Sequence, residues 1–190
     1  MRFLARVLTV PLLTVPFVLS GPPAQAAAPG VHVVTTHDTF AEYRPGEHAV
    51  TYRPELVPVG ARARVLSVST PGLGTTTRLA VTGLLPDRAY GAHVHTDPCG
   101  ATGAAAGPHY QHVPDPVRPS VDPAYANPEN EIWLDLTTDR LGRGAALSRV
   151  DWRFGPRRGK SIVLHEHHTA THPGHAGTAG ARLACVDVPF

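Results

Sequence analysis

Four histidines are the residues of this chain best suited to do chemistry. His93 and His95 flank Val94, and His109 and His165 follow further along the chain. In a β-strand, side chains at positions i and i+2 leave the same face, so His93 and His95 can offer imidazoles to one metal ion while Val94 points into a core. Four imidazoles in a tetragonal arrangement suit copper and leave a vacant position toward solvent. The pattern therefore predicts a copper site.

Each of these histidines lies in a short motif, and the order of the motifs is informative. In chain order they are His93-Val94-His95, Gly107-Pro108-His109, Leu164-His165-Glu166 and Gly180-Ala181-Arg182-Leu183-Ala184-Cys185. Each motif alone is weak, but the series resembles the copper/zinc superoxide dismutase family from about Val65 to Val188. The resemblance implies that His93, His95 and His165 ligate copper. It also implies that His109 is the histidine that bridges copper to zinc in the family.

The resemblance implies an activity as well. Copper(II) would oxidise one superoxide to oxygen, and copper(I) would reduce a second to hydrogen peroxide, with His109 carrying one of the protons. Arg182 would flank the open copper position, where a fixed guanidinium attracts a small anion such as superoxide. The sequence therefore predicts an enzyme, a superoxide dismutase.

The sequence departs from the family where zinc binds. The family has two further histidines and an aspartate after the bridging histidine, but Ile132 lies about where that aspartate belongs. The aspartate that links the two metals is also missing, and Thr169 lies near its place. Zinc needs four ligands, so its presence is doubtful and the sequence predicts a copper-only site.

His112 leaves one alternative open. With His109 and Asp115 it could form a second zinc or copper site, although a fourth ligand would be needed. If zinc is absent, the outer nitrogen of His109 needs a partner that fixes its tautomer, as carboxylates commonly do. Glu131 and Asp135 are the two candidates.

Additional histidines motivate a second hypothesis. They lie close together in a long loop, residues 167–181. This loop could gather copper or hold protons near the site, or it could be an ordinary solvated polar loop. Together with the lost zinc ligands they suggest a non-catalytic protein that buffers or delivers copper. A third hypothesis is a structural domain that holds zinc. The loop histidines are His167, His168, His172 and His175.

The beginning of the chain reads as a secretory signal. Residues 1–26 have two arginines before an apolar run and a small-residue cleavage site at Ala24-Gln25-Ala26. The run is too short, and too interrupted by proline, for a membrane span. Removing the two arginines balances basic and acidic residues, and the sequence has no basic tail or Lys/Arg stripe, so it does not predict nucleic-acid binding. We expect an exported protein whose substrate is a small molecule; its oligomeric state is not legible from the sequence.

The two cysteines, Cys99 and Cys185, fit this expectation. An even pair in an exported protein is expected to be oxidised. The resemblance implies the same bond, because in the family a cysteine after the paired-histidine strand joins one three residues beyond the active-site arginine. The predicted domains are the signal at 1–26, an extension of unknown role at 27–48 and the dismutase-like domain at 49–190.

Strand patterns recur at short spacing and no helical period is evident, so we predict an all-β fold. Eight short strands fit a Greek-key β-barrel or sandwich, which is also the fold that the resemblance implies. Two long loops, 97–130 and 167–181, would carry the chemistry, and the first holds too many prolines to be regular. The expected strands are 49–52, 62–70, 76–84, 89–96, 131–138, 145–154, 161–166 and 182–188.

Overall fold

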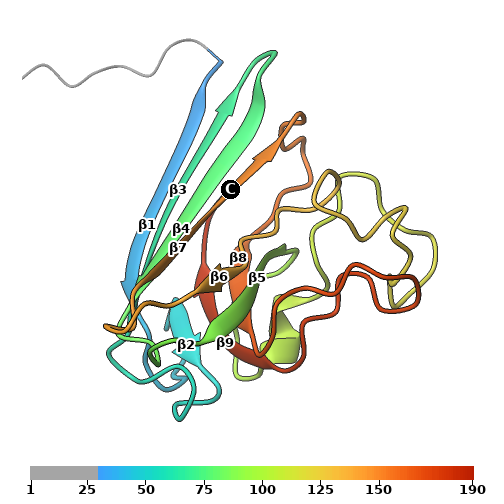
Figure 1. The fold of residues 1–190 in the computed structure, drawn as a ribbon. Coiled ribbons are helices and arrows are strands. Elements are labelled where there is room, and N and C mark those ends of the chain that lie inside the picture. The colour runs from blue at the N-terminus through green and yellow to red at the C-terminus, as the bar shows by residue number, and fades with distance from the viewer. Residues whose placement is uncertain (1–29) are drawn as a thin grey trace, which may run out of the picture.

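The fold is a β-sandwich. The computed structural model describes residues 30–190, which form two antiparallel sheets packed face to face (Figure 1). The first sheet has the strand order β1 (His32–Thr39), β3 (Arg62–Thr70), β4 (Gly74–Thr82) and β7 (Gly144–Val150). The second has the order β2 (Ala49–Thr51), β9 (Arg182–Asp187), β8 (Ser161–His165), β5 (Ala89–His95) and β6 (Leu136–Thr137). One 3₁₀-helix, η1 (Gly103–Ala106), interrupts the first long loop.

The predicted all-β class is confirmed, with one strand that the sequence did not indicate. Strand β1 pairs with β3 over eight residues, from His32 opposite Ser69 to Thr39 opposite Arg62. It lies in the segment 27–48, whose role the sequence left open, and it forms one edge of the first sheet. The described part of the chain therefore has nine strands instead of eight.

The segment 131–138 differs from its prediction in regularity but not in its alternation. Only Leu136 and Thr137 form a strand, and two isolated bridges hold Glu131 opposite Gln111 and Trp133 opposite His93. The apolar residues at every second position still point inward and are at most 3% exposed. The residues between them, which include Glu131 and Trp133, leave the other face. This alternation aims their polar groups at the loops.

The core lies between the two sheets. Strand β5 contributes Tyr90, Ala92 and Val94, and β4 contributes Leu79 and Val81, all nearly inaccessible to solvent. Strand β5 therefore turns its other residues, including the paired histidines, to the outside of the sandwich. Burial of these apolar faces supplies the main driving force for this arrangement.

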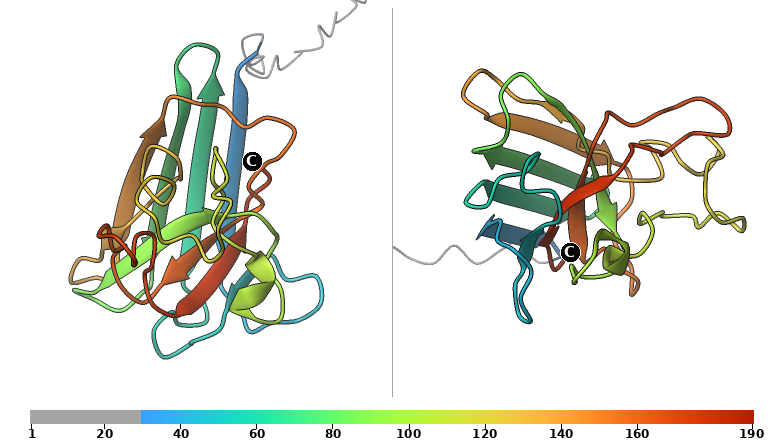
Figure 2. Two further views of the ribbon diagram at one scale, coloured as in Figure 1. Left: turned by 90° about the vertical axis from the view of Figure 1, so that its right-hand side faces the viewer. Right: turned by 90° about the horizontal axis from the view of Figure 1, so that it is seen from below.

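The two long loops pack outside the second sheet. In Figure 2 they lie on the side of the molecule away from the four strands of the first sheet. Gly91 on β5 permits the close approach of the second loop, because a Cβ there would collide with the His167 carbonyl and the Ala179 side chain. The disulfide Cys99–Cys185 ties the first loop to β9, as expected, with a Cα–Cα distance of 5.6 Å. The loops are thus fixed over the outward face of β5.

The expected signal segment, 1–26, lies outside the described residues. Within residues 30–190, no helix combines the length and the apolar character that a membrane crossing demands.

Candidate metal centre

Four histidines from different parts of the chain meet on the outer face of β5. His93 and His95 leave β5 side by side, His165 ends β8 at a register shift, and His109 enters from the first loop through a bridge to His95. The potential ligand atoms of the four side chains lie within 4.8 Å of one another. His93 and His95 are fully buried, His165 is nearly so, and the side chain of His109 is 17% exposed.

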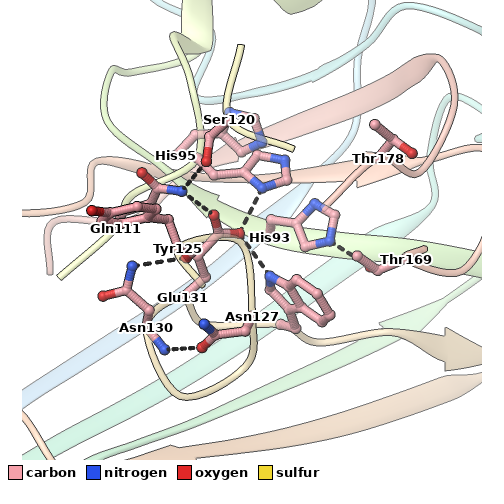
Figure 3. A network of polar contacts seen from close by, with 12 residues as sticks. His93, His95, Gln111, Ser120, Tyr125, Asn127, Asn130, Glu131, Thr169 and Thr178 are labelled. Carbon is pink, nitrogen blue, oxygen red and sulfur yellow. Dashed lines mark hydrogen bonds and ion pairs between the residues drawn. The ribbon is translucent and has the colours of Figure 1, made fainter. Parts of the chain in front are cut away.

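The hydrogen bonds of His93 define which ring nitrogen is free. The Thr169 hydroxyl donates to Asp135 Oδ1 at 2.8 Å, so its oxygen accepts the proton of His93 Nε2 at 2.6 Å (Figure 3). Asp135 is itself fixed by the Thr169 and Ala92 backbone N–H groups. His93 Nδ1 is then a lone pair that is buried without a hydrogen-bond partner. An unpaired buried acceptor is costly unless something fills its place.

His95 presents the opposite nitrogen. Its Nδ1 donates to the Gly107 carbonyl at 2.9 Å, which leaves Nε2 as the free lone pair. His95 Nε2 lies 3.3 Å from His165 Nε2, and His165 Nδ1 has no hydrogen-bond partner among the described residues. Gly107 is required here, since a Cβ at its positive φ of 70° would collide with the side chains of Thr96 and Asp97.

His109 is held by a buried carboxylate. Its Nδ1 donates to Glu131 Oε2 at 2.7 Å, and Trp133 Nε1 donates to the same oxygen at 2.7 Å. The Gln111 amide donates to Glu131 Oε1 at 2.8 Å and also to Ser120 (Figure 3). Three donors thus fix the Glu131 carboxylate, and the lone pair of His109 is left at Nε2.

The environment keeps three of the imidazoles neutral. Burial, followed by the charge of His109, lowers the pKa of His93 and of His95 well below the ordinary histidine value. The same two causes lower the pKa of His165 to about 3. Neutral imidazoles are the form that binds a metal ion, so protons do not compete with a metal for these lone pairs at neutral pH.

A cavity of about 390 Å³ opens beside the cluster and has both His109 and His165 in its wall. Arg182, half-buried, lines it as well, and its Nη1 donates to the Gly103 carbonyl at 2.8 Å. Arg118 from the first loop is a second guanidinium in the same wall. The cavity therefore combines access to the histidines with positive charge, which suits a small anion.

The residues considered for a second metal do not come together. His112 is exposed and stacks on Trp152 with 4.8 Å between ring centroids and 3° between planes. Asp115 turns instead to Ser120, with 2.7 Å between the Ser120 hydroxyl and Asp115 Oδ2. Ile132, where the resemblance places a zinc aspartate, is 1% exposed in the core. In residues 30–190, the other possible ligand group contains both disulfide cysteines, which have no free thiolate.

The four histidines and Arg182 were candidates from the sequence, and the structure brings them to one place. Of the two candidate carboxylates, Glu131 accepts the hydrogen bond from His109. Asp135 instead accepts from the hydroxyl of Thr169, which contacts His93. The sequence analysis did not identify roles for Gln111, Trp133 or Arg118. For Arg118 a signal existed, because it is the one basic residue of the loop 97–130.

No protein-family model matches the chain, and neither does any curated protein. Solved structures are similar at low identity. A Cu/Zn superoxide dismutase from Brucella abortus superposes with a TM-score of 0.53 and 20% identity over 83% of this chain and 98% of that one. A double mutant of a SOD-like protein from Bacillus subtilis gives 0.51 and 15% over 66% and 87%, and a single mutant gives 0.50 and 14% over 66% and 88%.

The two sheets and the four-histidine cluster describe a β-sandwich with a candidate metal centre on the outer face of one sheet. The chain shares its fold with Cu/Zn superoxide dismutase and with SOD-like proteins. Identities of 14–20% establish the fold, and the chemistry has to be argued from the residues of this chain.

Proposed function

We propose that the four-histidine centre binds copper without zinc and that the protein is an exported superoxide dismutase. The ligands would be His93 through Nδ1 and His95, His109 and His165 through Nε2. The observation that carries the proposal is the tautomer pattern: three outer nitrogens are occupied by Thr169, Gly107 and Glu131, and the other nitrogen of each of these rings carries its lone pair toward the cluster. Hydrogen bonds to the outer nitrogen are how proteins orient metal-binding histidines.

The partner of His109 supports a site for copper alone. Zinc would have to replace the Nδ1 proton of His109, which Glu131 accepts at 2.7 Å. Glu131 is 1% exposed and receives two further donors, so it is anchored where it is. A carboxylate thus supplies the orientation that a second metal would otherwise give. A set of four imidazole ligands suits copper.

Each residue of the site then has a part in the reaction. Copper held by the four histidines would supply the one-electron couple needed to oxidise one superoxide and reduce the next. Arg182 attracts superoxide into the cavity and donates hydrogen bonds to it. His109, the most exposed of the four rings, can take up a proton at Nε2, and Glu131 stabilises the imidazolium that results. His93 and His95, fully buried, keep the base of the site closed to water.

Metal analysis combined with a superoxide assay tests the proposal. We expect one copper and no zinc per chain, with dismutation that slows as ionic strength rises because the anion is attracted by charge. Zinc in place of copper, or no activity after verified copper loading, contradicts it. The two arms of the experiment are independent, so a metal result is informative even where the assay is negative.

The second candidate function is copper buffering without catalysis. It is favoured by the four histidines of the second loop, all of which are exposed. His172 and His175 have ring centroids only 4.9 Å apart. Copper binding at the four-histidine centre with no effect on superoxide would select this candidate. Zinc bound there without copper would select the structural domain instead.

Export is part of the proposal. The disulfide between Cys99 and Cys185 fits an oxidising compartment, where such bonds persist. Fractionation of the producing cells, combined with sequencing of the N-terminus of the mature protein, tests it. We expect cleavage after Ala26. A cytoplasmic protein that keeps residues 1–26 contradicts export without touching the metal site.

A further inference from the structure

The outer face of the four-stranded sheet is basic. At the exposed, outward positions of its strands lie Arg62 and Arg64 on β3, Arg78 on β4 and Arg149 on β7. The outward positions hold no carboxylate in any of the four strands, because Asp38 of β1 alternates to the other side. Four like charges without a counter-charge on the same face create a positive potential there.

These four guanidinium groups are free for a partner. The arginines with side-chain hydrogen bonds or ion pairs in residues 30–190 are others, among them Arg88, Arg143, Arg157 and Arg182. A hollow of about 370 Å³ is lined by Arg62 and Arg64 together with Ala80 and Thr82 of β4. A planar, multiply donating guanidinium is well matched to phosphate oxygens.

Apolar side chains are interleaved with the arginines. Leu66 and Leu147 lie directly opposite Arg78 on either side, in the register of β3, β4 and β7. Leu66 is 44% exposed and Leu147 is 52% exposed, and Val33 on β1 is 48% exposed. The face therefore offers both phosphate-binding groups and hydrocarbon to its partner.

The combination of arginines and exposed apolar side chains favours some classes of binding partner over others. A second copy of the same face would bring arginines against arginines, which is repulsive. A single-stranded nucleic acid would be expected to find large aromatic side chains for its bases, and the outward positions of these strands hold no phenylalanine, tyrosine or tryptophan. A duplex would satisfy the arginines through its phosphates but not the leucines. An anionic polysaccharide would satisfy the arginines but not the leucines. An anionic phospholipid surface satisfies both, with phosphates at the headgroups and an apolar boundary beneath them.

We propose that this face docks the protein on a bilayer that contains anionic phospholipids. Arg62, Arg64, Arg78 and Arg149 bind headgroup phosphates, and Leu66 and Leu147 enter the interfacial layer. The two long loops lie on the opposite side of the molecule (Figure 2). Docking therefore leaves the cavity beside His109 and Arg182 open to solvent.

Vesicle co-sedimentation tests this with the whole protein. We expect it to bind vesicles of phosphatidylglycerol and phosphatidylcholine at low salt, to be released as salt rises, and to ignore phosphatidylcholine alone. R64Q and R78Q should each weaken partitioning about fivefold, in line with the usual contribution of one basic residue near an anionic surface. The matched control is R44Q, which removes the same charge from an exposed turn off this face and should leave partitioning unchanged.

Two further measurements distinguish docking on lipid from a general attraction to polyanions. L66S should weaken binding to the anionic vesicles while retention on immobilised heparin, an anionic polysaccharide, stays as it was. Thermal melting controls for folding, since all these side chains are exposed. Equal partitioning of R64Q, R78Q and R44Q overturns the proposal, and so does heparin retention that depends on Arg64 and Arg78 when vesicle binding does not. Any contribution of residues 1–26 is common to every variant.

Discussion

Glu131 Oε2 lies 2.7 Å from His109 Nδ1, and the same oxygen lies 2.7 Å from Trp133 Nε1. Glu131 is one of the most deeply buried acidic residues described, at 1% exposure. A buried carboxylate is costly unless hydrogen-bond donors surround it. Here the donors include the candidate metal ligand itself, so the position of His109 and the satisfaction of Glu131 depend on each other.

Replacing Glu131 with Gln tests this dependence. The amide of Glu131→Gln has one acceptor oxygen for the three donors that face the carboxylate, so His109 or one of its neighbours loses its partner. We expect copper affinity to fall roughly 10- to 100-fold, as is usual when a group that orients a ligand is lost. Competition with a copper chelator measures the affinity. Glu129→Gln is the control, since Glu129 is exposed two residues earlier, and it should leave copper binding intact.

Thr169 decides which nitrogen His93 presents. Thr169→Val keeps the shape of the side chain and removes the oxygen that accepts from His93 Nε2. We expect the metal-free protein to show a mixture of His93 tautomers by nitrogen NMR and about tenfold weaker copper binding. Thr169→Ser, which restores the hydroxyl, should recover both. A single unchanged tautomer in Thr169→Val would mean that Asp135, whose Oδ1 is 3.8 Å from His93 Nε2, suffices alone.

The paired histidines were predictable because their geometry is local. His93, Val94 and His95 follow the two-residue alternation of a strand, and the structure buries Val94 in the core while both histidines face outward. The convergence of His109 and His165 was not derivable from periodicity, because it depends on long-range pairing of β5 with β8 and on the loop bridge to His95. For these two, the order of the motifs carried the prediction.

Two features could not be predicted from the sequence, each for a different physical reason. Strand β1 has Val34 as its only buried side chain, so its apolar alternation is too weak to indicate a strand. Backbone pairing with β3 holds it in place. Thr169 was noted only as a missing aspartate. Its role follows from the packing of the second loop over β5, which places its hydroxyl between His93 and Asp135.

The metal-free protein should lose stability in acid. The pKa of His165 is lowered to about 3 in the folded state, and those of His93 and His95 are also well below the unfolded value of about 6.5. Below about pH 6.5 the unfolded chain therefore binds protons that the folded chain does not. The free energy of unfolding should fall by up to about 1.4 kcal/mol per pH unit through His165 alone as the pH drops toward 3, and His93 and His95 should add losses of the same sign. Denaturant titrations at several pH values measure this.

The contribution of His48 to stability has the opposite pH dependence, so this residue serves as a control. Its hydrogen bond to Asp187 raises its pKa, so its contribution is complete below the unfolded value and is lost as the pH rises through the folded one. His48→Ala should therefore steepen the loss of stability in acid, whereas His165→Leu should reduce it. Equal slopes for both variants would contradict the assignment.

Arg182 should govern the capture of superoxide. Its guanidinium lines the cavity with His109 and His165, and its hydrogen bond to the Gly103 carbonyl fixes it there. Arg182→Gln should lower kcat/KM for superoxide about tenfold and flatten its dependence on ionic strength, because a fixed charge steers the anion. Copper content should be unchanged, since Arg182 is not a ligand. Arg140→Gln removes an exposed charge from the turn between β6 and β7, which does not line the cavity, and should change neither quantity.

Arg118→Gln, in the same cavity wall as Arg182, should give a smaller change in the same direction. A salt dependence that survives in Arg182→Gln but disappears in Arg118→Gln would transfer the steering role to Arg118.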